Sequence, residues 1–375
     1  QEIKEANLPK LDTLYFGGGT PSVLTKEEFI DLASCFQLNE DYEFTIEANP
    51  DSLTEEKVEA YIQQGVNRIS LGVQTFSDSL LKSIGRKHTS QQVFQSISLL
   101  KEKGLDNISI DLIYALPNQT MEDVQKDVET FLNLNINHLS IYSLQIEENS
   151  IFGKQGLQPI ESDLEEEMYD WICMRLKQAG YQHYEISSFC KPNKQSKHNL
   201  VYWSDQDFFG LGCGASGCVN GNRYDNTNQI QSYLEKGSQP DFIEESLEDK
   251  SFNAIMMGLR TSYGVNIEKW NKKYSMDLEK KYHDVIEKYP GLIIQNNRLV
   301  CDEDSRKILH TILIYILGFL LLPFAFPKPL RWILSCTTRI ITTCTCVQKM
   351  ISLAITTLLL PWQSTIATLL PITVH

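Results

Sequence analysis

The strongest constraint on the fold is the alternation, within residues 11–142, of short apolar runs with longer helical patterns. The apolar runs are rich in Ile, Phe, Leu and Val, which predicts strands that are buried on both faces. Because the connections are short, the alternation favours a parallel sheet covered by helices, either a barrel or a doubly wound layer. We expect strands at 12–16, 43–48, 67–73, 108–113 and 137–142, and helices at 25–36, 54–64, 77–84, 90–103 and 120–133.

Each predicted strand ends in glycine or in polar residues. The first ends in Gly17-Gly18-Gly19-Thr20, and the later ones end near Glu47, Gln74, Asp111 and the 140–147 segment. Any one polar residue there could simply cap the next helix. In a βα barrel, however, functional groups collect at the carboxyl ends of several strands. Five such ends favour a barrel with a ligand site, where bare glycine amides let a ligand approach the backbone.

Composition narrows the classes of function. The 375 residues carry a net charge of −14, which argues against a nucleic-acid partner. Nine cysteines are scattered without zinc-finger spacing or a disulfide framework, and we recognise no signal peptide, so we expect a reducing cytoplasm. We interpret Cys213 and Cys218 as packed thiols rather than as a metal pair. Residue 1 is Gln and a strand follows almost at once, so we expect a truncated N-terminus.

The C-terminal stretch differs in composition from the rest of the chain. Every Asp and Glu lies at or before Asp304. The apolar run between Lys307 and Lys328 approaches the roughly 20 residues that span a bilayer. Three interpretations stay open: a membrane hairpin with a positive flank, a buried helical appendage, or out-of-frame translation. We favour the last, because the stretch shows neither an amphipathic period nor helix caps.

The strand–helix period ends near residue 150. An amphipathic helix is predicted at 161–179, followed by the motif HNxxYW from His198 to Trp203 and a glycine-rich turn at 210–217. We therefore divide the chain into a barrel (1–150), a smaller α+β or helical domain (151–305) and a hydrophobic tail (306–375).

Five segments together resemble a known family. They are GGGTPS, IEANPDSLT, ISLGVQTFSDSLLKSIGRKHT, ISIDLIYALPNQT and LSIYSLQIEENS, and their order and spacing resemble the radical S-adenosylmethionine (SAM) proteins related to oxygen-independent coproporphyrinogen III oxidase. The resemblance covers about residues 10 to 300. Within that family, HNxxYW and the glycine-rich turn after it are similar to the heme chaperone branch, the HemW-like proteins.

The resemblance implies a partial (β/α)6 barrel, here without its first strand, with a C-terminal domain on its open side. It implies SAM contacts from Gly18, Gly19, Thr20, Glu47, Gln74, Arg86 and Asp111, with Arg86 pairing with the SAM carboxylate. It also implies heme as a ligand of His198, Tyr202 and Trp203, with the imidazole on the iron, and heme-acceptor proteins as partners. Membrane contact would come through the tail or through a membrane-bound acceptor.

One departure from the family concerns its cofactor. Radical SAM chemistry uses a 4Fe–4S cluster on a Cys-x3-Cys-x2-Cys loop, and none of the nine cysteines has that spacing. We therefore expect no SAM cleavage by this chain, and an unpaired sheet edge beside residues 11–16. Two alternatives to a heme chaperone stay open. One is an oxidoreductase that decarboxylates coproporphyrinogen III, and the other is an inactive fragment.

Overall fold

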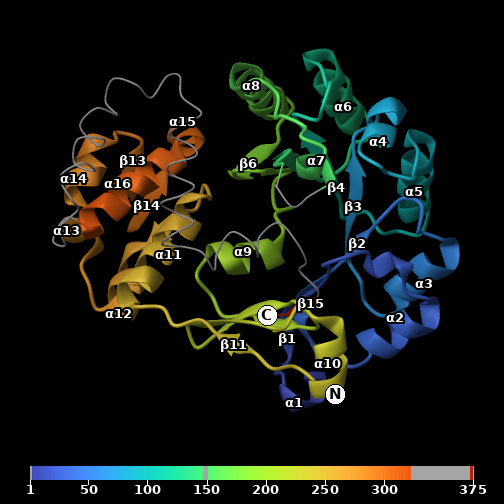
Figure 1. Cartoon of the computed structure of the whole chain (residues 1–375), viewed down its shortest axis with the longest axis horizontal. Coiled ribbons are helices and arrows are strands. Elements are labelled where there is room, and N and C mark those ends of the chain that lie inside the picture. The colour runs from blue at the N-terminus through green and yellow to red at the C-terminus, as the bar shows by residue number, and fades with distance from the viewer. Residues whose placement is uncertain (1, 147–150, 322–371, 375) are drawn as a thin grey trace. The chain divides into compact units, whose positions relative to one another are not determined.

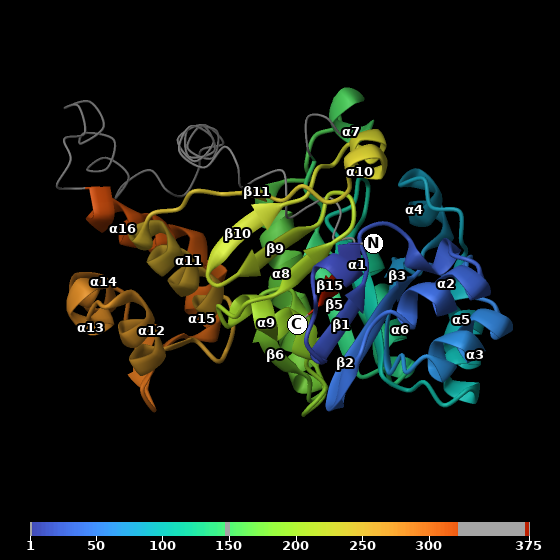
Figure 2. The same ribbon diagram turned by 90° about the horizontal axis from the view of Figure 1, so that it is seen from below.

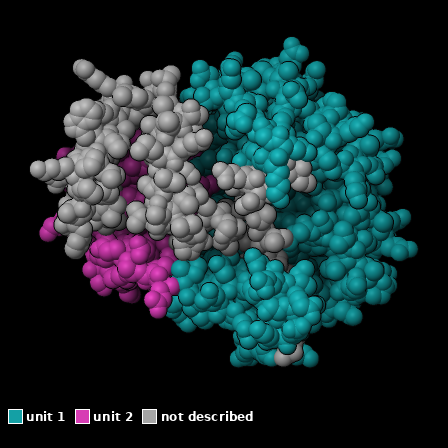
Figure 3. Space-filling view, viewed as in Figure 1, with its two compact units in different colours: residues 1–243, 370–375 teal, residues 244–369 magenta. Residues whose placement is uncertain are grey.

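The computed structural model describes residues 2–146, 151–321 and 372–374 (Figure 1). These residues form two compact units, of which the first runs to Ile243 and includes the short C-terminal strand. The second unit begins at Glu244, and Figure 3 distinguishes the two by colour. The predicted boundaries near residues 150 and 305 stay predictions, because a compact unit and a family domain are different divisions of a chain.

Five parallel strands form the centre of the first unit, close to the positions expected from the sequence, except that the second begins at Leu38 rather than at residue 43. They pair in sequence order, so each new strand extends the same edge of the sheet. Figures 1 and 2 show that the sheet curls, with helices along its outer side. The strands are β1 (Leu11–Phe16), β2 (Leu38–Ala48), β3 (Arg68–Gln74), β4 (Ile108–Tyr114) and β5 (His138–Ser143).

Antiparallel strands extend this sheet on both sides. β7 (Ser188–Cys190) pairs with β5, and β6 (Gln182–Glu185) pairs with β7. On the other side, β15 (Ile372–Val374) pairs with β1, and β8 (Phe209–Leu211) pairs with β15. The prediction of an unpaired edge beside β1 is therefore wrong, because β15 supplies hydrogen bonds to that edge.

Side chains alternate between the two faces of the parallel strands. On β2, Phe44 and Ile46 belong to the hydrophobic core shared with the outer helices. The intervening Glu43, Thr45 and Glu47 face the concave side. Polar residues of the neighbouring strands fall on the same side: Tyr15, Arg68, Ser70, Ser109, Asp111 and His138. The interior of a closed βα barrel is filled with apolar side chains, so this polar inner face favours ligand binding over core packing.

The outer helices begin at residues that cap them. The side chains of Thr25, Thr54, Thr89 and Thr120 each accept a hydrogen bond from a backbone N–H of the first turn, and such caps contribute about 1 kcal/mol each. Ser77 precedes α4 in the same way but makes no such bond. The helices are α2 (Lys26–Ala33), α3 (Glu55–Gln63), α4 (Asp78–Ser83), α5 (Ser90–Glu102) and α6 (Met121–Asn133).

Helix α9 (Lys197–Trp203) lies inside the arc of strands, where Figure 1 shows it facing the concave side. The predicted amphipathic helix is α8 (Ser162–Gln178), which packs against α6 and buries Met168, Ile172 and Leu176. The other elements of this unit are α1 (Glu2–Glu5), a 3-10 turn (Pro21–Val23), α7 (Ile151–Lys154), β9 (Ser216–Val219), β10 (Asn222–Asp225), α10 (Ile230–Lys236) and β11 (Asp241–Phe242).

The second unit packs helices beside a three-stranded antiparallel sheet. The strands are β12 (Val265–Asn266), β14 (Arg298–Cys301) and β13 (Leu292–Gln295), in that spatial order. The helices are α11 (Leu247–Leu259), α12 (Ile267–Tyr274), α13 (Leu278–Lys281), α14 (His283–Lys288), α15 (Glu303–Lys307) and α16 (Leu309–Leu321).

Helix α16 lies in the part of the predicted hydrophobic tail that the structure describes. It packs against α11 and α14, with Leu309, Ile312 and Ile316 buried, as a helical appendage would. Among the described residues, no helix is both long and apolar enough to cross a membrane. Most of the predicted tail, 322–371, lies outside the described residues.

Candidate functional site

A pocket of about 160 Å³ opens at the carboxyl ends of β1, β2 and β3. Five of the seven residues predicted to bind SAM line it: Gly19, Thr20, Glu47, Gln74 and Arg86. Ala48, Asn49, Ser70 and Gly72 complete the lining. The pocket therefore lies on the rim where the strand ends predicted a ligand site.

The glycine loop after β1 needs glycine for a different reason at each position. A Cβ on Gly17 would lie 2.6 Å from Cε1 of Tyr15 and 2.9 Å from Oε1 of Glu47. Gly18 adopts a φ of +78°, which side chains disfavour. A Cβ on Gly19 would meet no protein atom within 4 Å, so at this position it is the pocket space that a side chain would occupy.

Glu47 places a carboxyl group in the pocket. The hydroxyl of Tyr15 donates a hydrogen bond of 2.7 Å to Oε1 of Glu47. Burial raises the pKa of Glu47 to about 7, although the bond from Tyr15 opposes that rise. The charge of Glu47 therefore changes close to neutral pH, where it can respond to hydroxyl or ammonium groups of a ligand.

Asp111 lies behind the pocket lining rather than in it. The hydroxyl of Ser70, which does line the pocket, donates to both carboxyl oxygens of Asp111, at 3.0 and 3.2 Å. Burial raises the pKa of Asp111, and the bond from Ser70 and the nearby Arg68 oppose the rise. Asp111 thus acts on the pocket both through Ser70 and through the effect of its charge on Glu47.

Gln74 occupies a strained backbone position at the end of β3. Its φ is +68°, in the left-handed region, and the pairing of β3 with β4 shifts register between Gly72 and Gln74. The residue is only 8% exposed and still lines the pocket. Such strain costs about 1–3 kcal/mol and is concentrated at functional sites.

Arg86 brings a positive charge to the pocket. Its side chain is half-buried, and burial lowers its pKa while the charge of Asp51 opposes the shift. Among the described residues, no acidic side chain forms an ion pair with this guanidinium. A guanidinium offers a planar set of donors for a carboxylate, so Arg86 is suited to an anionic group of a ligand.

The predicted heme residues lie on α9. The ring of His198 is 1% exposed and both nitrogens have partners: Nδ1 lies 2.8 Å from Oγ1 of Thr13, and Nε2 lies 2.5 Å from the hydroxyl of Tyr202. The ring also stacks on Tyr15, with centroids 5.0 Å apart. Tyr202 and Trp203 are half-buried. The structure thus brings His198 and Tyr202 together.

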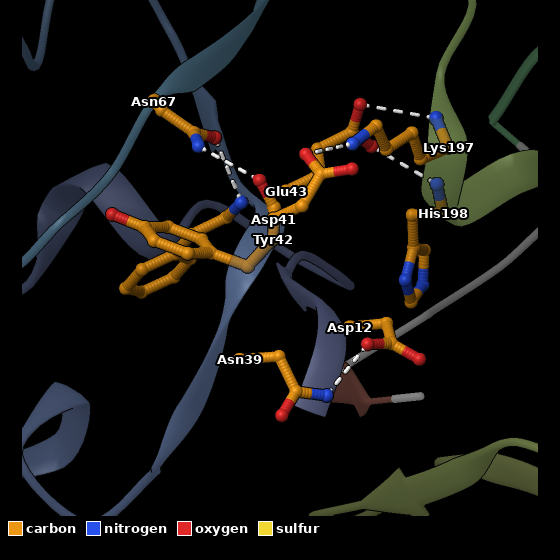
Figure 4. A network of polar contacts seen from close by, with 9 residues as sticks. Asp12, Asn39, Asp41, Tyr42, Glu43, Asn67, Lys197 and His198 are labelled. Carbon is orange, nitrogen blue, oxygen red and sulfur yellow. Dashed lines mark hydrogen bonds and ion pairs between the residues drawn. The ribbon is translucent and has the colours of Figure 1, made fainter. Parts of the chain in front are cut away.

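A buried carboxylate fixes the start of α9. Glu43 is 4% exposed and accepts hydrogen bonds from the backbone N–H groups of Lys197 and His198, both at 3.0 Å (Figure 4). The side chain of Ser196 donates to the same carboxylate at 3.4 Å. Unpaired N–H groups and the helix dipole make this end of a helix favourable for a negative charge.

Comparison with known proteins gives these residues a family. A sequence model of the radical SAM superfamily matches residues 1–131. The chain is 42% identical over 297 residues to heme chaperone HemW of Lactococcus lactis subsp. lactis (strain IL1403), covering 76% of this chain and 78% of that protein. The chain belongs to the HemW family. Heme chaperone HemW of Bacillus subtilis (strain 168) is 37% identical over 300 residues, covering 76% and 79%.

A solved structure shows the fold of this HemW family member in a second protein. Coproporphyrinogen III oxidase (HemN) from Escherichia coli, described as a radical SAM enzyme, superposes with a TM-score of 0.70. The match covers 81% of this chain and 77% of that chain at 19% identity. The shared fold confirms the predicted partial barrel with a smaller second part.

Membership of the radical SAM superfamily implies SAM and a 4Fe–4S cluster as family cofactors. The rim pocket fits SAM in its chemistry, because it combines a carboxyl group, amides, space above Gly19 and a guanidinium that forms no ion pair with a described residue. The cluster finds no such fit, since the described part of the chain holds no group of three His, Cys, Asp or Glu side chains suited to a metal. Cys213 donates to the carbonyl of Thr227, like a packed thiol.

Of the four lining residues outside the predicted set, two carry polar side chains, and one supporting residue also escaped the sequence prediction. Asn49 and Ser70 line the pocket, and Tyr15 holds Glu47. Ser70 could have been found from strand periodicity, because it stands two residues before Gly72 on the same face. Tyr15 could not, since its position within an apolar run indicates only burial.

Proposed function

We propose that this chain is a heme chaperone, which binds heme and passes it to acceptor proteins, with SAM held in the rim pocket. The 42% identity to heme chaperone HemW over 78% of that protein is the observation that carries the proposal. The fold shared with HemN favours neither chaperone nor oxidase, because proteins of one fold host different functions.

In the SAM site that we propose, each predicted residue has a separate task. The Gly18–Thr20 loop runs beside the methionine part of SAM, and Arg86 pairs with its carboxylate. Glu47 and Gln74 accept from or donate to the ribose hydroxyls and the ammonium group. Asp111 acts behind them by orienting Ser70. SAM supplies a sulfonium group that can be cleaved by an electron, and we assign no residue of this chain to that step.

For heme we propose the surface of α9, with His198 on the iron and Tyr202 and Trp203 against the macrocycle. Both ring nitrogens of His198 have partners in the present conformation. Ligation therefore requires Nε2 to exchange the hydroxyl of Tyr202 for iron. Because His198 is only 1% exposed and also contacts Thr13 and Tyr15, ligation further requires the ring or α9 to move outward from these contacts.

Titration with hemin tests this proposal. We expect a shifted Soret band that saturates at one heme per chain, and at least a tenfold loss of affinity in His198→Ala, since coordination is then lost. His283→Ala is a matched control, because His283 is exposed on α14 of the second unit. An unchanged spectrum in a folded His198→Ala variant would contradict ligation by His198. Turnover of coproporphyrinogen by a reconstituted protein that also carries the cluster loop would instead favour the oxidase.

We further propose a cytoplasmic location. All six cysteines that the structure describes are free thiols, and free thiols persist in a reducing compartment. Membrane contact through a membrane-bound heme acceptor is part of the same proposal.

A further inference from the structure

Tyr15 connects two regions that the proposed function treats separately. Its hydroxyl donates to Glu47 in the rim pocket at 2.7 Å, and its ring stacks on His198 of α9 at 5.0 Å with an interplanar angle of 19°. The side chain is 9% exposed, so neither contact competes freely with water. One buried side chain therefore touches a pocket residue and the HNxxYW helix.

The surroundings keep Tyr15 in this place. Gly17 leaves the room for it, because a Cβ there would lie 2.6 Å from the Tyr15 ring and 2.9 Å from Oε1 of Glu47. His198 is itself held by Thr13, which lies two residues before Tyr15 on β1. The pocket and α9 are thus joined by rigid, packed groups over a short path.

We propose that Tyr15 is a positioning residue that aims the Glu47 carboxylate into the pocket and couples ligand binding there to the packing of His198. This inference rests on the proposed SAM site. A ligand that draws Glu47 toward itself acts on the Tyr15 hydroxyl, and the stacked ring passes the shift to α9.

The charges around Glu47 define how the coupling responds to pH. Tyr15 on β1, Asp111 on β4 and the backbone N–H of Gly18 act on Glu47 directly, and Arg68 on β3 acts on Tyr15. The Tyr15 hydrogen bond favours the ionised carboxylate, whereas Asp111 and burial favour the neutral form. SAM affinity should therefore be retained above the pKa of Glu47 and lost as the pH falls through about 7.

The variant Tyr15→Phe removes the hydroxyl and keeps the ring. The pKa of Glu47 should rise further, so the loss of SAM affinity moves to higher pH. At pH 7 we expect roughly tenfold weaker SAM binding, as for the loss of a hydrogen bond to a charged group, and a smaller difference at pH 8.5. Tyr61→Phe is the control, because Tyr61 is also buried and its hydroxyl has no hydrogen-bond partner among the described residues.

Two measurements on the whole chain decide the matter. Calorimetric titration with SAM from pH 6 to 8.5 should show the shifted profile in Tyr15→Phe and an unshifted one in Tyr61→Phe. Hydrogen exchange should show that SAM protects the amides of Lys197 and His198 in the wild type and not in Tyr15→Phe. If Tyr15→Phe does not fold, Glu47→Gln replaces it, and should abolish both the pH dependence and the protection of α9.

The possible failures are distinguishable. If the wild type binds no SAM at any pH, the proposed SAM site fails and the coupling fails with it. If the wild type binds SAM but Tyr15→Phe keeps the wild-type pH profile and the protection of α9, the SAM site stands and the role of Tyr15 is overturned.

Discussion

The rim pocket and the buried start of α9 both contain polar side chains, but these side chains differ in whether the protein supplies their partners. In the pocket, Arg86 forms no ion pair with a described residue, and Gln74 has a strained backbone. At α9, Glu43 satisfies two backbone N–H groups and one hydroxyl. One region therefore keeps polar groups ready for a ligand, and the other uses them to fix a helix.

This difference distinguishes residues that bind a ligand from residues that stabilise the fold. A buried polar group with all its partners in place contributes to stability, and its removal costs stability first. A pocket group without a protein partner contributes little to folding, and its removal costs binding first. Variants in the two regions should therefore fail in different assays.

The largest effect is expected at Glu43. Glu43→Ala leaves buried donors of Ser196, Lys197 and His198 without an acceptor, at a cost of about 3 kcal/mol in the free energy of unfolding. Urea unfolding followed by circular dichroism measures it. Asp41→Asn is the control, because its ion pair with Lys197 is exposed and worth at most about 0.5 kcal/mol. Equal losses in the two variants would show that Glu43 does not fasten α9.

The next effect is expected in binding rather than in stability. Arg86→Met removes the guanidinium that we propose for the SAM carboxylate, which should weaken SAM binding by about 2 kcal/mol, or roughly thirtyfold. The free energy of unfolding should hardly change, because Arg86 forms no ion pair with a described residue and the charge of Asp51 acts on it only from farther away. Lys87→Met controls for net charge, since Lys87 is exposed on the same loop. A loss of stability without a loss of SAM binding would show that Arg86 stabilises the fold and does not bind SAM.

Much of the fold was predictable from the sequence, and there is a physical reason why the remaining features were not. The parallel strands and their helices were predictable because apolar runs and threonine caps mark them locally. The prediction missed the start of β2 at Leu38, because the residues that follow Leu38 are polar and partly exposed and so do not form an apolar run. Two contacts join residues far apart in sequence, so no local pattern predicts them. They are the pairing of β15 with β1 and the hydrogen bonds that Glu43 accepts from α9.

The pocket itself was predictable to the extent that its residues follow strands. Glu47 and Gln74 come together because the carboxyl ends of parallel strands meet at one rim, and Arg86 reaches the pocket from the loop between α4 and α5. The place of Asp111 behind Ser70 could not be predicted, since depth within the curled sheet depends on the stagger between β3 and β4.

The smallest effect tests the strain in the pocket. Gln74→Gly should raise the free energy of unfolding by about 1 kcal/mol, because glycine adopts the left-handed region without the cost that Gln74 bears at its φ of +68°. SAM binding should weaken in the same variant, since the amide side chain leaves the pocket. Gln74→Ala separates the two effects: it removes the amide and keeps the strain.

Stability and binding should therefore move in opposite directions only in the glycine variant. Thermal unfolding and SAM titration of both variants measure this. Asn118 offers a comparison outside the pocket lining, because it has a φ of +64° and an exposed side chain. Asn118→Gly should stabilise the chain less than Gln74→Gly does, because asparagine tolerates the left-handed region better than glutamine, and it should leave SAM binding intact. If Gln74→Gly lowers the free energy of unfolding, side-chain contacts hold the backbone of Gln74, and the residue is not strained for binding. Arg86 alone would then support the difference between the pocket and the start of α9.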